Sequence, residues 1–205
     1  MTNIKVFEND LPEDLDLSNE KLIGLDNEAL GLVLGRDPLT LVQLGLESKN
    51  FYLVKLNRET YNAPNLIKAL SNKNTQFIMH YARQDLLWLK YHLKVQPKNI
   101  FCTKVASKIA RTASSYHGYK DLVKELCGKD ISKKEQQSDW GDPNLSEKQI
   151  KYAASDTEHL FEIRNKLIKM LEREKRINLF KRSMEVIPIL VDMEMAGYKL
   201  STFEH

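Results

Sequence analysis

One apolar segment that ends in two carboxylates constrains this chain more than any other stretch. Leu22 to Leu25 read as a buried strand, and Asp26 and Glu28 follow it two positions apart. Because side chains alternate along a strand, both acids are expected on one face of the sheet. Two carboxylates this close raise each other's pKa or need a cation between them. A strand that ends in a solvated polar turn gives the same local pattern. The rest of the chain must therefore decide between a cation site and an ordinary turn.

The rest of the chain alternates strand-like and helix-like segments. Its 205 residues are 42% hydrophobic and 29% charged, which is typical of a folded soluble domain. Strands come first and helices then alternate with short strands, which indicates an α/β fold with a central mixed sheet flanked by helices. The expected strands are 3–8, 22–26, 39–44, 51–54, 76–79 and 99–102. One helix is expected to start at Pro64, and four others are expected over about 82–93, 103–111, 118–127 and 146–175. A loop is expected over 129–143.

The C-terminal part, residues 177–205, reads as a further helix that contains Pro188 and Gly197. It has too little mass for a core of its own. We therefore expect it to pack on the preceding domain, residues 1–176, or on a neighbouring subunit.

Hydropathy and cysteine spacing bear on the cellular location and on the state of the two cysteines. No run of 18 apolar residues occurs and the N-terminus lacks a signal-peptide pattern, so we expect a cytoplasmic protein with no membrane partner. Cys102 and Cys127 are too far apart for a C-x-x-C motif and are expected to pack as small apolar residues rather than to bind zinc.

The formal net charge is only +3, but basic residues concentrate in one segment. Between Phe101 and Lys134, eight Lys and Arg residues stand against three acids. Lys104, Lys108 and Arg111 share one face of the expected helix. This face is either an ordinary solvated surface or a binding site for phosphate groups.

Two further aspartates occupy unusual positions. Asp85 lies in the first turn of the 82–93 helix, at the border of its apolar stripe. Asp156 falls inside the apolar stripe of the 146–175 helix, where an unpaired carboxylate is costly. Asp85 alone is also explained by a favourable helix dipole.

If the four acids converge, their oxygen-only ligand set suits Mg²⁺ or Mn²⁺ rather than zinc. Two such ions would bind the attacking and the leaving oxygen of a phosphoryl transfer and lower the pKa of a bound water, which is phosphodiester hydrolysis chemistry. Tyr152 precedes Asp156 by one helical turn on the same face, so its phenol can orient the attacking water.

The order Asp26-x-Glu28, Asp85 and Tyr152-x3-Asp156 resembles the DEDDy group of 3′→5′ exonucleases. The resemblance covers about residues 20–175 and implies a ribonuclease H-like (DnaQ-like exonuclease) fold for residues 1–176. Further segments are similar to the ribonuclease D family: Val42-Gln43-Leu44, Lys133 with Gln137-Ser138-Asp139-Trp140, and Gln149 to Asp156. Asn27, Ala29 and Gln84 depart from the family pattern; Asn27 is expected to point away from the carboxylates.

Within this family the chain resembles the compact nano-RNase C enzymes. That resemblance implies an RNA dinucleotide substrate and a ring-like homo-oligomer, an octamer. It also implies that Asp26, Glu28 and Asp156 hold one ion, that Asp26 holds the second, and that Asp85 contacts the ions directly or through water. Leu32 corresponds to a leucine wedge between the two bases, and His80 to a histidine that contacts substrate. Lys108, Arg111, Gln137 and Ser138 are candidates for contacts to the 5′-phosphate or the backbone.

Three functions stay open on the sequence. The first is hydrolysis of dinucleotides or very short oligoribonucleotides to nucleoside 5′-monophosphates. The second is a ribonuclease D-like 3′→5′ exonuclease that acts on longer RNA or DNA ends; short DNA as a substrate is undecided. The third is an inactive nucleic-acid-binding module, against which the complete set of acids argues.

Overall fold

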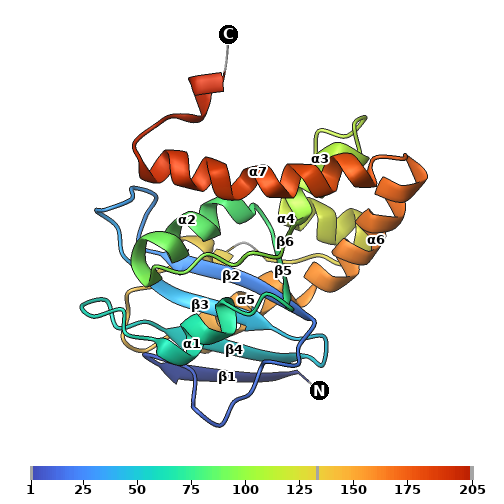
Figure 1. The fold of residues 1–205 in the computed structure, drawn as a ribbon. Coiled ribbons are helices and arrows are strands. Elements are labelled where there is room, and N and C mark those ends of the chain that lie inside the picture. Colours follow the sequence, from blue (N-terminus) through green and yellow to red (C-terminus); the bar gives the residue numbers. More distant parts are fainter. Residues whose placement is uncertain (1, 133, 204–205) are drawn as a thin grey trace.

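A six-stranded mixed sheet forms the centre of the molecule (Figure 1). The computed structural model describes residues 2–132 and 134–203, so Lys133 lies outside the described residues. The spatial order of the strands is β1-β4-β3-β2-β5-β6. Their bounds are β1 (Asn3–Glu8), β2 (Leu22–Ala29), β3 (Leu39–Gly45), β4 (Asn50–Lys55), β5 (Gln76–Met79) and β6 (Ile100–Cys102). Strands β2, β3 and β4 form an antiparallel meander, whereas β1, β5 and β6 join parallel to their neighbours.

Strand β2 is longer than the sequence predicted. It continues past Asp26 to Ala29 because its partner β3 stays paired with it over that length. Its other neighbour, β5, pairs only as far as Gly24. The second half of β2, which carries Asp26 and Glu28, therefore has one edge that no strand of the described residues covers.

Helices cover both faces of the sheet and confirm the predicted α/β architecture. Their bounds are α1 (Pro64–Leu70), α2 (Ala82–Leu93), α3 (Thr103–Ala110), α4 (Tyr119–Leu122), α5 (Glu147–Glu158), α6 (Leu160–Arg173) and α7 (Ile177–Met195). Three short segments in the described residues are other kinds of helix: the π-helix η1 (Val123–Cys127) and the 3-10 helices η2 (Lys134–Gln137) and η3 (Leu200–Phe203). Alternation along β3 separates two apolar layers. Leu41 packs with Ala153 of α5, and Val42 belongs to the larger cluster that includes α1 and α2.

The prediction of a single helix over 146–175 is wrong. Its start is confirmed, because Ser146 and Gln149 form a capping box. The helix breaks at His159, which separates α5 from α6. The hydroxyl of Tyr119 lies in this break: it donates to the Ser155 carbonyl at 2.8 Å and accepts from the His159 amide at 3.3 Å. A side chain inserted into the helical hydrogen-bond ladder is a known cause of such kinks.

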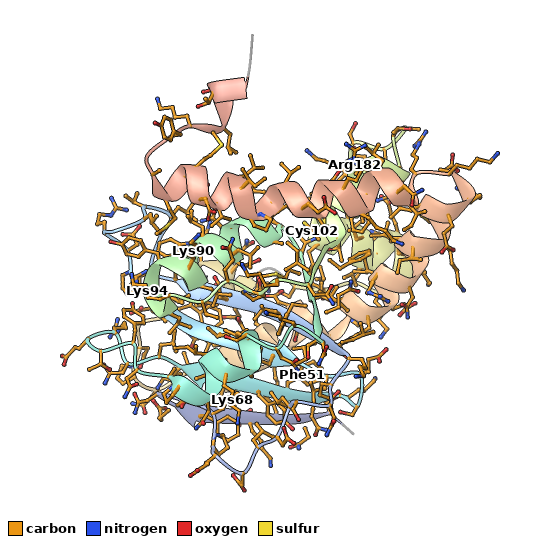
Figure 2. The ribbon with its side chains drawn as sticks, in the orientation of Figure 1. Phe51, Lys68, Lys90, Lys94, Cys102 and Arg182 are labelled. Atoms are coloured by element: carbon orange, nitrogen blue, oxygen red, sulfur yellow. The ribbon has the colours of Figure 1, made fainter. Side chains whose placement is uncertain are left out.

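Helix α7 lies across α2 and α3 on the outside of the molecule (Figure 1). Its inner face buries Phe180, Met184, Ile187 and Val191. Pro188 does not end the helix. The ion pairs Arg83–Glu194 and Lys90–Asp192 also join α2 to α7, and Figure 2 labels Lys90 on this side of α2. None of the helices in the described residues is both long and apolar enough to cross a membrane.

Candidate active site

Two glycines let helix α5 approach the strand that carries the carboxylates. Gly24 of β2 and Gly45 of β3 are register partners, and both face Thr157 of α5. A Cβ on Gly45 would lie 2.5 Å from the Thr157 hydroxyl oxygen, and one on Gly24 would lie 3.2 Å from the Thr157 carbonyl. At Gly45 a Cβ would clash with Thr157, and at Gly24 it would be a tight contact, so the two glycines allow α5 to lie this close to the sheet. Asp156, the residue before Thr157, is thereby held over β2.

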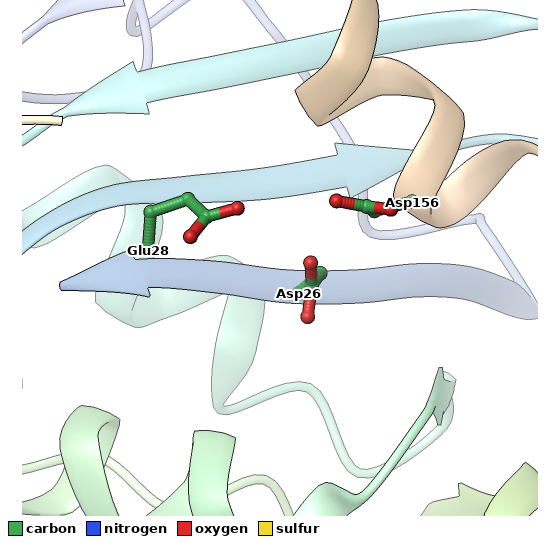
Figure 3. A group of neighbouring side chains, drawn as sticks. All are labelled: Asp26, Glu28 and Asp156. Carbon is green, nitrogen blue, oxygen red and sulfur yellow. The ribbon is translucent and has the colours of Figure 1, made fainter. Parts of the chain in front are cut away.

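Three carboxylates meet at this contact. Asp26 and Glu28 alternate onto the α5-facing side of β2, and Asp156 reaches them from the helix (Figure 3). One ligand oxygen from each lies within 4.8 Å of the other two. The structure thus brings together three of the four acids that the sequence predicted to converge.

The electrostatics of the cluster favour a bound cation. Burial raises the pKa of Asp26 to about 7. Burial, followed by the charges of Asp26 and Asp156, raises the pKa of Glu28 to about 10. Three carboxylates cannot all ionise here without a counter-charge, because like charges close together in a poorly solvated site oppose one another.

Asp85 approaches from the other side of β2. It lies in the first turn of α2, is only 6% exposed, and is not one of the three clustered acids. Burial, followed by the charge of Asp26, holds its pKa well above the usual range. Its Oδ2 atom is buried without a hydrogen-bond partner among the described residues. The Asn27 amide donates to the Asp85 carbonyl at 3.2 Å, so Asn27 points away from the carboxylate face, as expected, and links β2 to α2.

Tyr152 lies one turn before Asp156, as predicted. Its phenol is half-buried, and its pKa is raised by burial and then by the charges of Asp156 and Glu28. The hydroxyl therefore stays protonated at neutral pH. It can hold a water by hydrogen bonding but cannot act there as a phenolate base.

Two cavities flank the cluster, and Asn27, Glu28 and Gln136 line both of them. The smaller has a volume of about 330 Å³ and contains Asp26, Asp156 and Tyr152 together with His80, Tyr81, Lys104 and Tyr119. The larger, of about 660 Å³, is lined by Asp85, Leu30, Leu32, Trp88, Gln137, Ser138 and Trp140.

The cavities separate the predicted substrate contacts into two groups. Four of them line a cavity wall: Leu32, His80, Gln137 and Ser138. Lys108 is exposed and lines neither cavity. Arg111 also lines neither, since its guanidinium pairs with Glu125 and bonds to the Tyr116 carbonyl. Helix α3 begins beside the site, so only its first turn reaches a cavity.

The smaller cavity is also lined by Lys104, which the sequence placed on the basic face but not among the substrate contacts, and by residues that the sequence did not indicate, such as Tyr119. Lys104 precedes Lys108 by one turn on the same basic face and lies over the Tyr81 ring, with its Nζ 4.0 Å from the ring centre. Tyr119 comes from α4 and packs against His80 with ring centres 5.6 Å apart. The basic face that the sequence offered as a phosphate-binding surface includes Lys104, but no sequence pattern singles out Tyr119.

The residues of this site fit a divalent cation. The ligand set consists of carboxylate oxygens, which hard cations prefer. Two buried groups beside this ligand set lack hydrogen-bond partners among the described residues: the Asp85 Oδ2 atom and the side-chain amide of Gln43. Gln43 is the register partner of Asp26 on β3. Ordered water around a bound ion would satisfy such groups.

Comparisons with known proteins agree with this geometry. A family model described as "3′-5′ exonuclease" matches residues 5–172. Ribonuclease D of Xanthomonas oryzae is 30% identical over 176 residues, which cover 86% of this chain and 48% of that protein. The chain thus spans about half the length of the curated ribonuclease D relatives it matches.

Solved structures match over the whole chain, among them two of one protein. Brucella melitensis NrnC with bound Mg²⁺ has a TM-score of 0.93 at 32% identity, covering 100% of this chain and 99% of that one. The same protein bound to pGG has a TM-score of 0.93 at 33% identity with the same coverage. The chain belongs to the 3′→5′ exonuclease family with the ribonuclease H-like fold, in the group that includes NrnC.

Proposed function

We propose that this chain hydrolyses RNA dinucleotides and very short oligoribonucleotides from the 3′ end and releases nucleoside 5′-monophosphates. The observation that carries the proposal is the group of three carboxylates between two small cavities. The likeness over the full chain to a protein solved with both Mg²⁺ and pGG supports the choice of substrate.

The acids would hold two divalent cations, Mg²⁺ or Mn²⁺. Asp26, Glu28 and Asp156 would hold one, Asp26 would share the second, and Asp85 would contact the ions directly or through water. When bound, the cations supply Lewis acidity and lower the pKa of a coordinated water. The protonated Tyr152 phenol would orient the attacking water toward phosphorus, opposite the leaving 3′ oxygen.

The cavities would each take one nucleotide. Leu32 is 84% exposed on the loop after β2, where an apolar side chain can insert between two bases. The Lys104 ammonium lies in the smaller cavity beside His80, where it can bind a phosphate oxygen. Gln137 and Ser138 would contact the nucleotide in the larger cavity.

A ribonuclease D-like activity on longer RNA or DNA ends is the second candidate. The ribonuclease D relatives favour it, since their identity to this chain extends over most of its length. A long strand would need an open path beyond the cavities and a larger surface for phosphate contacts.

A time course on 5′-labelled RNAs of two and seven nucleotides, with a DNA dinucleotide beside them, tests the choice. The test compares the wild-type chain with Asp85→Asn and with Asp142→Asn, an exposed acid outside both cavities. We expect rapid cleavage of the RNA dinucleotide, little change in the seven-mer, and loss of cleavage in Asp85→Asn alone. Shortening of the seven-mer at a comparable rate would contradict the dinucleotide proposal and favour the second candidate.

The division into a catalytic domain, 1–176, and a C-terminal segment, 177–205, is part of this proposal, as are a cytoplasmic location and a ring-like homo-oligomer. The outer face of α7 leaves Leu179, Val186 and Ile189 more than 45% exposed, which supports contact with another subunit. Sedimentation of the wild-type chain and of Val186→Lys/Ile189→Lys tests it. We expect a large oligomer that the double substitution dissociates; a wild-type monomer at micromolar concentration would refute the assembly.

A further inference from the structure

A tyrosine from a distant part of the chain opens helix α5 immediately beside Asp156. In an uninterrupted helix the His159 amide would donate to the Ser155 carbonyl. Instead, the Tyr119 hydroxyl lies between these two groups and bonds to both, at 2.8 Å and 3.3 Å. The bond that would continue α5 into α6 is thus replaced by two bonds to a side chain of α4.

This insertion determines where the last turn of α5 lies. Ser155 directly precedes Asp156, and its own hydroxyl donates back to the Tyr152 carbonyl at 2.7 Å. On the other side of Asp156, Thr157 packs into the space left by Gly24 and Gly45. Asp156 is therefore held between a backbone group bonded to Tyr119 and a side chain packed on the sheet.

Removal of the hydroxyl would leave the Ser155 carbonyl without this donor and the His159 amide with the Thr157 carbonyl as its remaining acceptor among the described residues. Because such groups seek new partners, the Ser155 carbonyl and the His159 amide would then close toward each other. That closure continues the helix and turns the segment 155–159 relative to β2. The Asp156 carboxylate would then no longer be held in place beside Asp26 and Glu28.

We propose that Tyr119 is a positioning residue that keeps α5 open between Ser155 and His159 and so fixes Asp156 in the cation-binding cluster. The inference rests on the proposed function only in requiring that the cluster binds a divalent cation. It does not depend on which nucleic acid is cleaved. Tyr119 acts through the backbone and needs no contact with substrate.

The test is a calorimetric titration of the chain with Mn²⁺ in the absence of substrate. It compares the wild-type chain with Tyr119→Phe, which keeps the ring against His80 and removes only the hydroxyl. The matched control is Tyr61→Phe, which removes a phenol that donates to the Leu39 carbonyl at 3.1 Å and lines neither cavity. We expect Mn²⁺ affinity to fall about tenfold or more in Tyr119→Phe and to stay unchanged in Tyr61→Phe.

Kinetics and melting separate positioning from simple stability. With a dinucleotide substrate at limiting Mn²⁺, kcat should fall in Tyr119→Phe while KM stays near the wild-type value. Both phenylalanine variants should melt slightly below the wild type, because each loses hydrogen bonds to backbone groups. Mn²⁺ affinity within twofold of wild type in a folded Tyr119→Phe would overturn the inference.

A crystal structure of the wild-type chain with Mn²⁺ provides a second test that needs no variant. We expect the Tyr119 hydroxyl to remain within hydrogen-bond distance of the Ser155 carbonyl when the cation is bound. A hydroxyl released from Ser155 in that structure would refute the inference. If the wild type binds Mn²⁺ more tightly than Tyr119→Phe but does not cleave dinucleotides, the proposed substrate is wrong and the role of Tyr119 stands.

Discussion

Replacing Asp26 with Asn should stabilise the cation-free chain, and only at a pH above the ordinary range of a carboxyl group. Burial raises the pKa of Asp26 from 3.8 in the unfolded chain to about 7 in the folded chain. The folded state therefore binds this proton more tightly than the unfolded state does. By linkage, the cation-free chain loses stability as pH rises from about 4 through about 7, and the loss is complete above that range.

The size of this effect follows from the same pKa. A rise from 3.8 to about 7 corresponds to about 4 kcal/mol for ionising Asp26 in the folded chain at pH 8, as an upper limit. Asn has nearly the same shape as the protonated acid and avoids this cost. For a chain of this length, each kcal/mol changes the melting temperature by about 2–4 °C, so a gain of several degrees is expected at pH 8.

The assay is thermal melting in EDTA at about pH 5 and about pH 8, with Asp130→Asn, a well-exposed acid, as the control. Asp26→Asn should melt above the wild type at the higher pH and close to it at the lower one, and the control should show no difference. Saturating Mg²⁺ should reverse the order at pH 8, because a bound cation stabilises only the chain that can hold it. A lower melting temperature for Asp26→Asn in EDTA at pH 8, or an equal gain at both pH values, would refute the reasoning.

Three further predictions concern separate parts of the site. Tyr152→Phe should lower kcat by about 100-fold and leave Mn²⁺ affinity unchanged, as measured by single-turnover kinetics and calorimetry; an equal loss of Mn²⁺ binding would argue against a water-orienting role. Leu32→Ala should raise the KM for a dinucleotide about tenfold without lowering the melting temperature, since this side chain is 84% exposed; an unchanged KM would exclude a wedge. Gly45→Ala should reduce the free energy of unfolding in urea by about 1–3 kcal/mol, because its Cβ would lie 2.5 Å from the Thr157 hydroxyl oxygen, and Thr157→Ala should recover part of that loss. Gly45→Ala with wild-type stability would contradict the close packing of α5.

Local periodicity explains the predictions that the structure confirms. The alternation that places Asp26 and Glu28 on one face, the strand β5 and the capping box at Ser146 each depend on residues only a few positions apart. The one-turn spacing between Tyr152 and Asp156 is equally local. For such features, backbone geometry alone relates sequence distance to spatial distance.

Packing between distant segments determined the features of the site that local sequence did not predict. The seating of Thr157 between Gly24 and Gly45 sets the depth of α5, and the Tyr119 hydroxyl breaks a helix that the periodicity of residues 146–175 predicted as continuous. The same packing brings Lys104 rather than Lys108 to a cavity. Local sequence was enough to identify the acids and the face of the strand or helix on which each lies. The distances between them depend on how whole elements pack against one another, which local sequence does not specify.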